Sequence, residues 1–340
     1  MRKLFNCGFF VIVLVILILA TSSVFATDDT TKYRFAVVPP AVHPFYGNFP
    51  QALKDVAKDL NIPEPDLQFP QHFNQIEQNE ILDGFVARGY KGIALQPSEP
   101  MAANEQISKM VNQGVNVVLF GAATPQPTDA IFFIGDDYYD LSYKAAKYLA
   151  EALGGKGNIV HLTGMIADAN TRPRMKAIED VMNEYPDIKL IQTIADIDVV
   201  EAAQNTISAL LAAKRTEIDG IICTAYVPSV TVATQFRQLN ERRIKAVLID
   251  TDKAVMDAIR DGYVLMTLAK NSASWPYLAV YSLKLFTDGY TWKEDAPFVI
   301  KGGTVFVDSS NIDNLEQEFY KNTKQLQENW VKNYFNSPNK

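Results

Sequence analysis

Short apolar runs rich in Val and Ile recur along the chain, separated by amphipathic stretches of about 12–16 residues. The first run is FAVV at 35–38, and GIAL at 92–95 is another. This alternation constrains the fold more than any other feature, because it is typical of βαβ units wound around parallel sheets. We therefore expect an α/β protein.

The pattern restarts after residue 134, which indicates two similar lobes, each a doubly wound parallel sheet. In the first half we expect strands at 35–38, 92–95, 115–120 and 131–134, and helices at 50–60, 74–88 and 101–113. In the second half we expect strands at 158–162, 188–194, 220–224 and 246–250, and helices at 172–185, 199–214 and 230–239. The segments 264–268, 275–288, 304–307 and 315–334 are too few for a third domain and should complete the first two.

The start of the chain has the order of a secretory signal peptide. Arg2 and Lys3 precede an apolar run at 4–20, which is followed by polar residues and the small-residue junction VFA at 24–26. We expect cleavage after Ala26, which makes 1–26 a signal peptide and places the mature protein in a periplasm. The alternative is a retained anchor, since the run of about 17 residues is nearly long enough to span a bilayer.

Charge and cysteine content narrow the class of protein further. Lys and Arg number 32 and Asp and Glu 39; loss of Arg2 and Lys3 would leave 30 basic residues, a formal charge of −9. The sequence contains no cluster of basic residues of the kind that binds nucleic acid. Only Cys223 follows the signal segment, so an intramolecular disulfide is impossible and stability must come from the core. We expect a monomer.

Nothing in the sequence indicates catalysis, a cofactor or a metal. His43, His72 and His161 lack the spacing of metal ligands, and no nucleophile stands beside a base in a known pattern. The run GGKG at 154–157 resembles a phosphate loop but follows an expected helix rather than a strand, so it is better interpreted as a helix stop and turn.

Several short motifs occur in a recognisable order: FAVV at 35–38 with HPFY at 43–46, GIALQP at 92–97, TG at 163–164 with NTR at 170–172, and LID at 248–250. In this order the chain resembles, over nearly its whole length, type I periplasmic solute-binding proteins of the ribose and galactose class. The resemblance implies two lobes joined by three crossings, expected near 135–137, 270–271 and 301–303. The first lobe would then be 33–136 with 271–301, and the second 137–270 with 302–336.

The same resemblance implies a ligand in the cleft between the lobes. Phe45 and Tyr46 would stack on a sugar ring, although aromatic residues beside proline are more often packing residues. His43 stands where sugar binders often have asparagine, or is simply a loop residue. The guanidinium of Arg172 would donate hydrogen bonds to two ligand oxygens, and the carboxylate of Asp250 would accept hydrogen bonds from adjacent ligand hydroxyls. Their alternatives are an exposed helix-end arginine and a helix N-cap.

Other positions depart from the family pattern. Lys270 falls where glutamine is common, Tyr226 where asparagine is common, and Ile197 where an aromatic is frequent. Gly121-Ala122 replaces a usual Asp-Arg pair. We still expect the ligand to be a sugar. Because His43 and Lys270 are hydrogen-bond donors, an anionic or modified sugar could also bind, and the identity of the ligand is open.

The resemblance also implies a mechanism and a partner. The lobes would close on the ligand, and the closed shape would be recognised by the permease of an ABC importer. The alternative partner is the outer domain of a sensor kinase or chemoreceptor, which the sequence does not separate from a permease.

Overall fold

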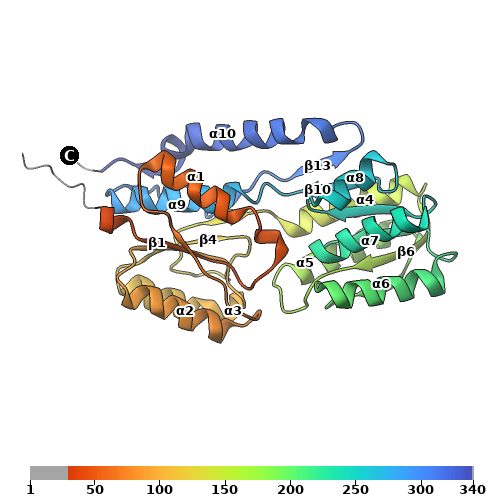
Figure 1. The fold of residues 1–340 in the computed structure, drawn as a ribbon, viewed down its shortest axis with the longest axis horizontal. Coiled ribbons are helices and arrows are strands. Elements are labelled where there is room, and N and C mark those ends of the chain that lie inside the picture. The colour runs from red at the N-terminus through yellow and green to blue at the C-terminus, as the bar shows by residue number, and fades with distance from the viewer. Residues whose placement is uncertain (1–29, 339–340) are drawn as a thin grey trace, which may run out of the picture.

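The computed structural model describes residues 30–338, so the expected signal segment lies outside the described part. Two six-stranded sheets with flanking helices make up two lobes side by side (Figure 1). Within residues 30–338, none of the helices has the length and apolar character needed to cross a membrane.

The first sheet is entirely parallel, with strand order β12-β5-β4-β3-β1-β2. Its strands are β1 (Phe35–Val38), β2 (Asp66–Leu67), β3 (Gly92–Leu95), β4 (Asn116–Phe120), β5 (Phe133–Gly135) and β12 (Val299–Lys301). Its helices are α1 (Phe49–Leu60), α2 (Gln75–Ala87), α3 (Pro100–Asn112) and α9 (Ser274–Thr287).

The central strands β1 and β3 are buried and without polar side chains at every position, because both faces of the sheet are covered there. Phe35 and Val37 of β1 pack under α1 and α9, whereas Ala36 and Val38 pack on the opposite side with α2 and α3. Alternate residues of a strand point to opposite faces. The continuous apolar runs of the sequence are therefore strands buried on both sides.

The second sheet has the order β13-β10-β9-β8-β6-β7 and is parallel except for β13, which pairs antiparallel with β10. Its strands are β6 (Lys156–Leu162), β7 (Asp187–Ile194), β8 (Gly220–Cys223), β9 (Lys245–Ile249), β10 (Met266–Ala269) and β13 (Val305–Asp308). Its helices are α4 (Tyr138–Ala152), α5 (Thr171–Glu184), α6 (Val200–Lys214), α7 (Tyr226–Leu239) and α8 (Lys253–Arg260).

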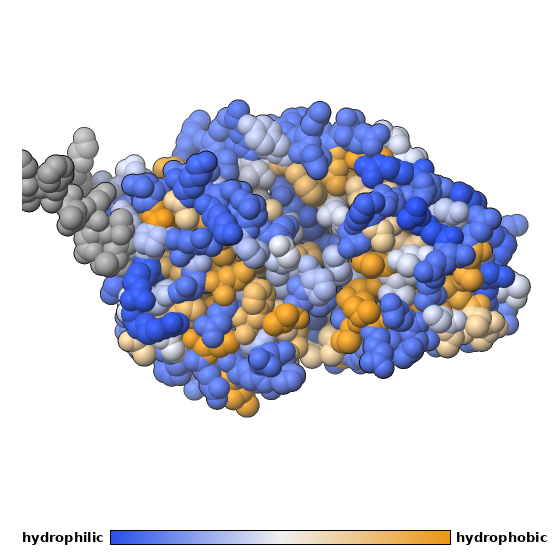
Figure 2. All heavy atoms as spheres, in the orientation of Figure 1, coloured by the Kyte–Doolittle hydropathy of each residue, from blue (hydrophilic) through white to orange (hydrophobic). Residues whose placement is uncertain are grey.

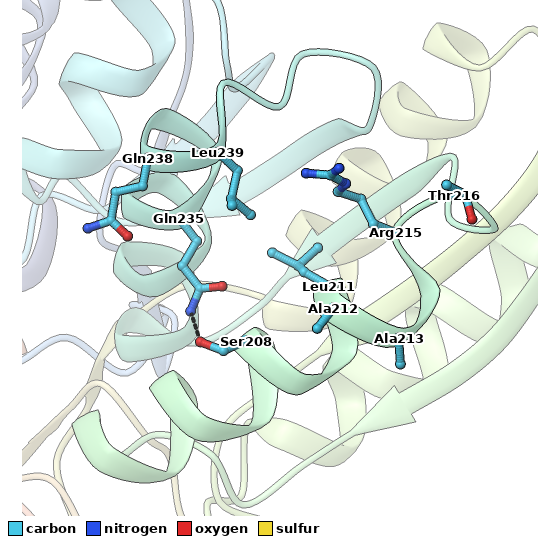
Figure 3. A pocket seen from close by; sticks show the side chains of 9 residues that line it. All are labelled: Ser208, Leu211, Ala212, Ala213, Arg215, Thr216, Gln235, Gln238 and Leu239. Carbon is cyan, nitrogen blue, oxygen red and sulfur yellow. Dashed lines mark hydrogen bonds between the residues drawn. The ribbon is translucent and has the colours of Figure 1, made fainter.

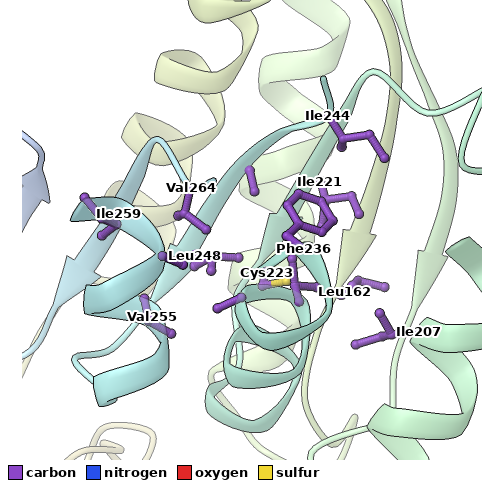
Figure 4. Packing of buried hydrophobic residues seen from close by; sticks show 14 of the residues in the cluster. Leu162, Ile207, Ile221, Cys223, Phe236, Ile244, Leu248, Val255, Ile259 and Val264 are labelled. Carbon is purple, nitrogen blue, oxygen red and sulfur yellow. The ribbon is translucent and has the colours of Figure 1, made fainter. Parts of the chain in front are cut away.

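One face of this sheet packs on α6, α7 and α8, with Phe236 and Leu248 among the residues of a continuous apolar cluster (Figure 4). Cys223 is buried in the same cluster, and its burial raises the thiol pKa far above the usual value. The other face packs on α4 and α5. Helix α4 is the helix that was expected before the GGKG run, although no bounds were predicted for it. The GGKG run follows α4, and its last two residues begin β6; Gly154 and Gly155 have positive φ, as expected for a helix stop.

The chain passes between the two sheets three times. The passages are 136–137 between β5 and α4, 270–273 between β10 and α9, and 302–304 between β12 and β13. Lys270 begins the second passage, so its side chain lies where both lobes and the hinge meet.

The C-terminal segment corrects the expected lobe boundaries. Helix α10 (Leu315–Tyr334) begins against the second lobe, where Leu315 joins the cluster of Figure 4. It then runs back over α9 (Figure 1), and Trp330 is fully buried in the first lobe, with its Nε1 donating to Ser282 Oγ at 2.9 Å. Strand β14 (Phe335–Asn336) pairs there with β11 (Thr291–Trp292). The end of 302–336 therefore packs with the first lobe.

Candidate ligand-binding site

A pocket of about 480 Å³ lies between the lobes. Its walls are loops that follow β1, β3, β7, β8, β9 and β10, together with the first turns of α4 and α5. Parallel sheets bind ligands beyond the carboxyl ends of their strands, where such loops converge. Of the residues expected at the site, six line this pocket: His43, Phe45, Tyr46, Tyr226, Asp250 and Lys270.

Asp250 and Lys270 form a buried ion pair in the wall of the pocket, with Nζ and Oδ1 3.1 Å apart. Asp250 has a left-handed backbone, with φ of 71°, and its carbonyl accepts from Thr267 Oγ1 at 2.8 Å. Burial raises the pKa of Asp250 and lowers that of Lys270, and each charge opposes the shift of the other. Asp250 Oδ1 is buried and, beyond its ion pair with Lys270, makes no aligned hydrogen bond within the described residues.

Lys270 also touches the aromatic wall, because its Nζ lies 4.3 Å from the centre of the Phe45 ring. Phe45 is half-buried and packs against Trp275 with ring centres 5.8 Å apart. A ring held in this way is a flat apolar surface on which the carbon face of a sugar can stack.

The arginine of the site is Arg174, not Arg172. Arg172 is exposed and does not line the pocket, whereas Arg174 is buried and does. Two residues subtend about 200° of an α-helix, so the two side chains leave α5 on opposite sides. Arg174 Nη1 donates to the Thr224 carbonyl at 2.6 Å, and its buried Nε has no partner among the described residues. Tyr138 lies beneath the guanidinium, with its ring centre 4.5 Å from Cζ.

His43 of the first lobe and Asp198 of the second face each other, with Nε2 and Oδ2 3.5 Å apart. His43 Nδ1 accepts the backbone N–H of Phe45 at 3.2 Å, which leaves the imidazole proton on Nε2. Burial pushes the pKa of Asp198 upward, but His43 and the backbone N–H of Val227 outweigh it, and the pKa lies below its usual value.

A second contact also crosses the cleft, since Asn170 Nδ2 donates to the Gly121 carbonyl at 3.1 Å. Gly121 has φ of 65°, and a Cβ there would overlap the Gln96 side chain. The amide of Gln96 therefore fills the space beside the missing Asp-Arg pair. With both cross-cleft contacts made, the structure is a closed arrangement of the lobes.

Residues 35–291 match the model of the periplasmic binding protein domain. The chain belongs to this family.

Among its relatives are the xylitol-binding protein of Mycolicibacterium smegmatis and the D-apiose import binding protein of Paraburkholderia graminis, each 23% identical. These matches cover 57% and 58% of this chain, and 55% and 63% of the two relatives, so less than two thirds of each is spanned. A solved structure of an ABC transporter solute-binding protein from Burkholderia graminis, in complex with D-arabinose, shares the fold. It has a TM-score of 0.75, with 21% identity over 82% of this chain and 96% of that one.

The pocket is lined both by residues that the motifs predicted and by residues that they missed. Ile197 is only 4% exposed, belongs to the second-lobe core and is not among the residues that line the pocket. Its neighbour Asp198 lines the pocket instead. Tyr226 lines it too, although its hydroxyl donates to Asp252 at 2.8 Å.

A signal for Arg174 was present in the sequence. The buried residues of α5 recur at helical spacing: Thr171, Arg174, Ala177, Ile178, Val181 and Met182. Arg174 is the charged residue in that buried stripe. Following the helical period would have selected it over Arg172.

Another hollow, of about 440 Å³, lies on the outer surface of the second lobe between α6 and α7 (Figure 3). Leu211 and Ala212 form part of its floor, and Gln235 Nε2 donates to Ser208 Oγ at 2.8 Å across it. Arg215 is its one charged lining residue. This surface is remote from the converging loops, so the candidate site is the cleft between the lobes.

Proposed function

We propose that this chain is an exported solute-binding protein that captures a small neutral sugar or sugar alcohol and delivers it to an ABC importer. The observation that carries the proposal is a pocket between the lobes with hydrogen-bonding groups from both of them and an aromatic wall. The names of the relatives, which bind xylitol and D-apiose, and of the structure with D-arabinose support the same ligand class.

The charges of the pocket favour a neutral ligand over the anionic one that the sequence admitted. Three carboxylates line it, from Asp168, Asp198 and Asp250, against two cations, Arg174 and Lys270. Lys270 is already paired with Asp250. An anionic sugar would enter a site with no surplus positive charge, which costs desolvation without a compensating partner.

The residues that would contact the ligand are shared between the two lobes, and this explains how the ligand is captured. His43, Phe45 and Tyr46 belong to the first lobe, and Arg174 and Asp250 to the second. A ligand can engage both sets only when the lobes are closed, so binding shifts the population toward the closed form. The permease would recognise that form. A sensor domain remains the second candidate partner.

The proposal includes the mature protein as a periplasmic monomer, released by cleavage after Ala26, and involves no chemical turnover. Thermal-shift screening of neutral sugars, polyols, sugar acids and amino sugars tests the ligand class, because a ligand of the folded form raises the melting temperature. We expect stabilisation by neutral members and not by acids. Stabilisation by sugar acids alone would refute the neutral ligand, and recovery of a chemically altered ligand would refute the binding role.

A further inference from the structure

The polarity of the pocket is divided between its two walls. All of its Asp, Arg and Lys side chains come from the second lobe or the hinge: Asp168, Arg174, Asp198, Asp250 and Lys270. The first-lobe wall contains no carboxylate, Arg or Lys; it combines the apolar residues Pro40, Ala41, Val42, Phe45 and Phe73 with His43, Tyr46, Gln71, His72, Gln96 and Trp275. The ligand therefore meets the charged groups of the pocket on one side and a wall with five apolar residues on the other.

The polar groups of the first lobe are largely occupied by one another. Tyr46 donates its hydroxyl to Gln96 Oε1 at 3.1 Å, and His43 Nδ1 is used by the Phe45 backbone. His72 lies at the exposed rim, paired with Glu77 at 2.7 Å. What this wall still offers a ligand is the amides of Gln71 and Gln96 and the Nε1 of Trp275, which has no hydrogen-bond partner among the described residues, and no carboxylate.

Surface colouring shows apolar patches on both sides of the recess between the lobes (Figure 2). Val42, at the rim of the first-lobe wall, is 71% exposed in a closed arrangement of the lobes. Exposed apolar side chains next to a binding cleft indicate that the wall continues to its mouth.

A fully hydroxylated hexose carries hydroxyl groups around its whole perimeter. Those turned toward the first lobe would lose their water and find few acceptors there, and an unpaired buried hydroxyl is unfavourable. A sugar with a methyl group on that side loses no hydrogen bond and gains apolar contact.

We propose that the ligand is a deoxy sugar, a monosaccharide in which a methyl group replaces a hydroxymethyl group and lies against the first-lobe wall. The inference rests on the proposed function as a sugar-binding protein. The hydroxyls on its other edge are bound by Arg174 and Asp250, and the carbon face of the ring stacks on Phe45.

Calorimetric titration with matched pairs tests this: L-fucose against L-galactose, and L-rhamnose against L-mannose. Each pair differs only in the oxygen at the terminal carbon. We expect at least one deoxy member to bind about tenfold or more tightly than its partner, the ratio that corresponds to about 1.4 kcal/mol. Equal or tighter binding of the hydroxylated partners in both pairs would overturn the inference.

Ala41 supplies an internal control, because Thr and Val have nearly the same shape. Ala41→Thr adds a hydroxyl to the carbon wall and should reduce the preference for the deoxy sugar by several-fold relative to Ala41→Val. The same preference in both variants would contradict the assignment of the methyl group to this wall. If a fully hydroxylated sugar from the wider panel binds and no deoxy sugar does, the inference fails and the proposed function stands. If no sugar binds, the proposed function itself fails.

Discussion

Arg174 and Arg172 stand two positions apart on α5 and face opposite sides of it, so they form a matched pair for mutagenesis. Arg174→Ala removes a buried guanidinium, and hydrogen bonds to charged groups contribute roughly 1.5–3 kcal/mol. We expect sugar affinity to fall at least about tenfold by calorimetry.

Arg172→Ala is the control for that measurement and should leave affinity within about twofold, since surface changes are usually within ±0.5 kcal/mol. A loss of binding in the Arg172 variant, with none in the Arg174 variant, would restore the expectation drawn from the sequence motif. The melting temperature of both variants should be recorded, because Arg174 also holds the Thr224 carbonyl.

His161 predicts how stability depends on pH. It is fully buried beside Thr224, and burial, together with the charge of Arg174, lowers its pKa from 6.5 to about 3. Below pH 6.5 the unfolded chain takes up a proton at this position and the folded protein does not. The stability is therefore full above pH 6.5 and falls by about 1.4 kcal/mol per pH unit down to about pH 3.

His161→Gln removes this dependence. Chemical unfolding of both proteins should be measured between pH 7 and pH 4.5. As pH falls, the free energy of unfolding of the wild type should decrease relative to that of the variant, because the other titrating groups contribute equally to both proteins. Parallel curves over that range would show that the folded protein can protonate His161.

At the residue scale, sequence reasoning succeeded where a strand ends in a polar residue. Asp250 and Lys270 directly follow β9 and β10, and carboxyl ends of neighbouring strands meet at one edge of a sheet. It failed for Ile197 and Arg172, because a motif match locates a segment to within one or two residues. Which of those residues faces the cleft is decided by the helical or strand phase of the packed element.

Trp330 is the most deeply buried side chain of helix α10. Trp330 is fully buried against Phe132 and Tyr334, with ring centres 6.0 and 4.9 Å away. Truncating a buried Trp typically costs about 3–5 kcal/mol. We expect Trp330→Ala to destabilise the protein by that amount in urea unfolding.

Tyr320 lies on the same helix and is 69% exposed, which makes Tyr320→Ala the matched control. Its effect should stay within about 0.5 kcal/mol. Similar small effects for both variants would mean that α10 is not anchored in the first lobe.

The elements themselves were predictable to different degrees. Strands buried on both faces produce continuous Val and Ile runs, which are easily seen. Helix α4 buries Ser142, Ala145 and Ala146 beside Leu149, and such small residues give a weak hydrophobic period. The return of α10 to the first lobe was not predictable, because a Trp at helical spacing does not specify which lobe it packs against.

For the whole molecule, α10 adds a link between lobes that are otherwise joined by three passages. Leu315 packs in the second lobe and Trp330 in the first. Between them, Thr323 Oγ1 accepts from the side chain of Asn271, in the second passage of the hinge, at 2.7 Å. The helix is thus tied to both lobes and to the hinge in the closed arrangement.

Removing the hydrogen bond between Asn271 and Thr323 should weaken ligand binding without changing any residue of the pocket. Thr323→Val removes the acceptor for Asn271 and keeps the side-chain shape, and a hydrogen bond contributes roughly 0.5–1.5 kcal/mol. Because apparent affinity scales with the fraction of protein in the closed form, we expect calorimetry to show about a 2- to 10-fold loss. Thr287→Val, which removes a hydroxyl that bonds within α9 away from the hinge, is the control and should bind normally. If both variants bind as the wild type does, closure does not depend on α10, and the three passages alone set the balance between open and closed forms.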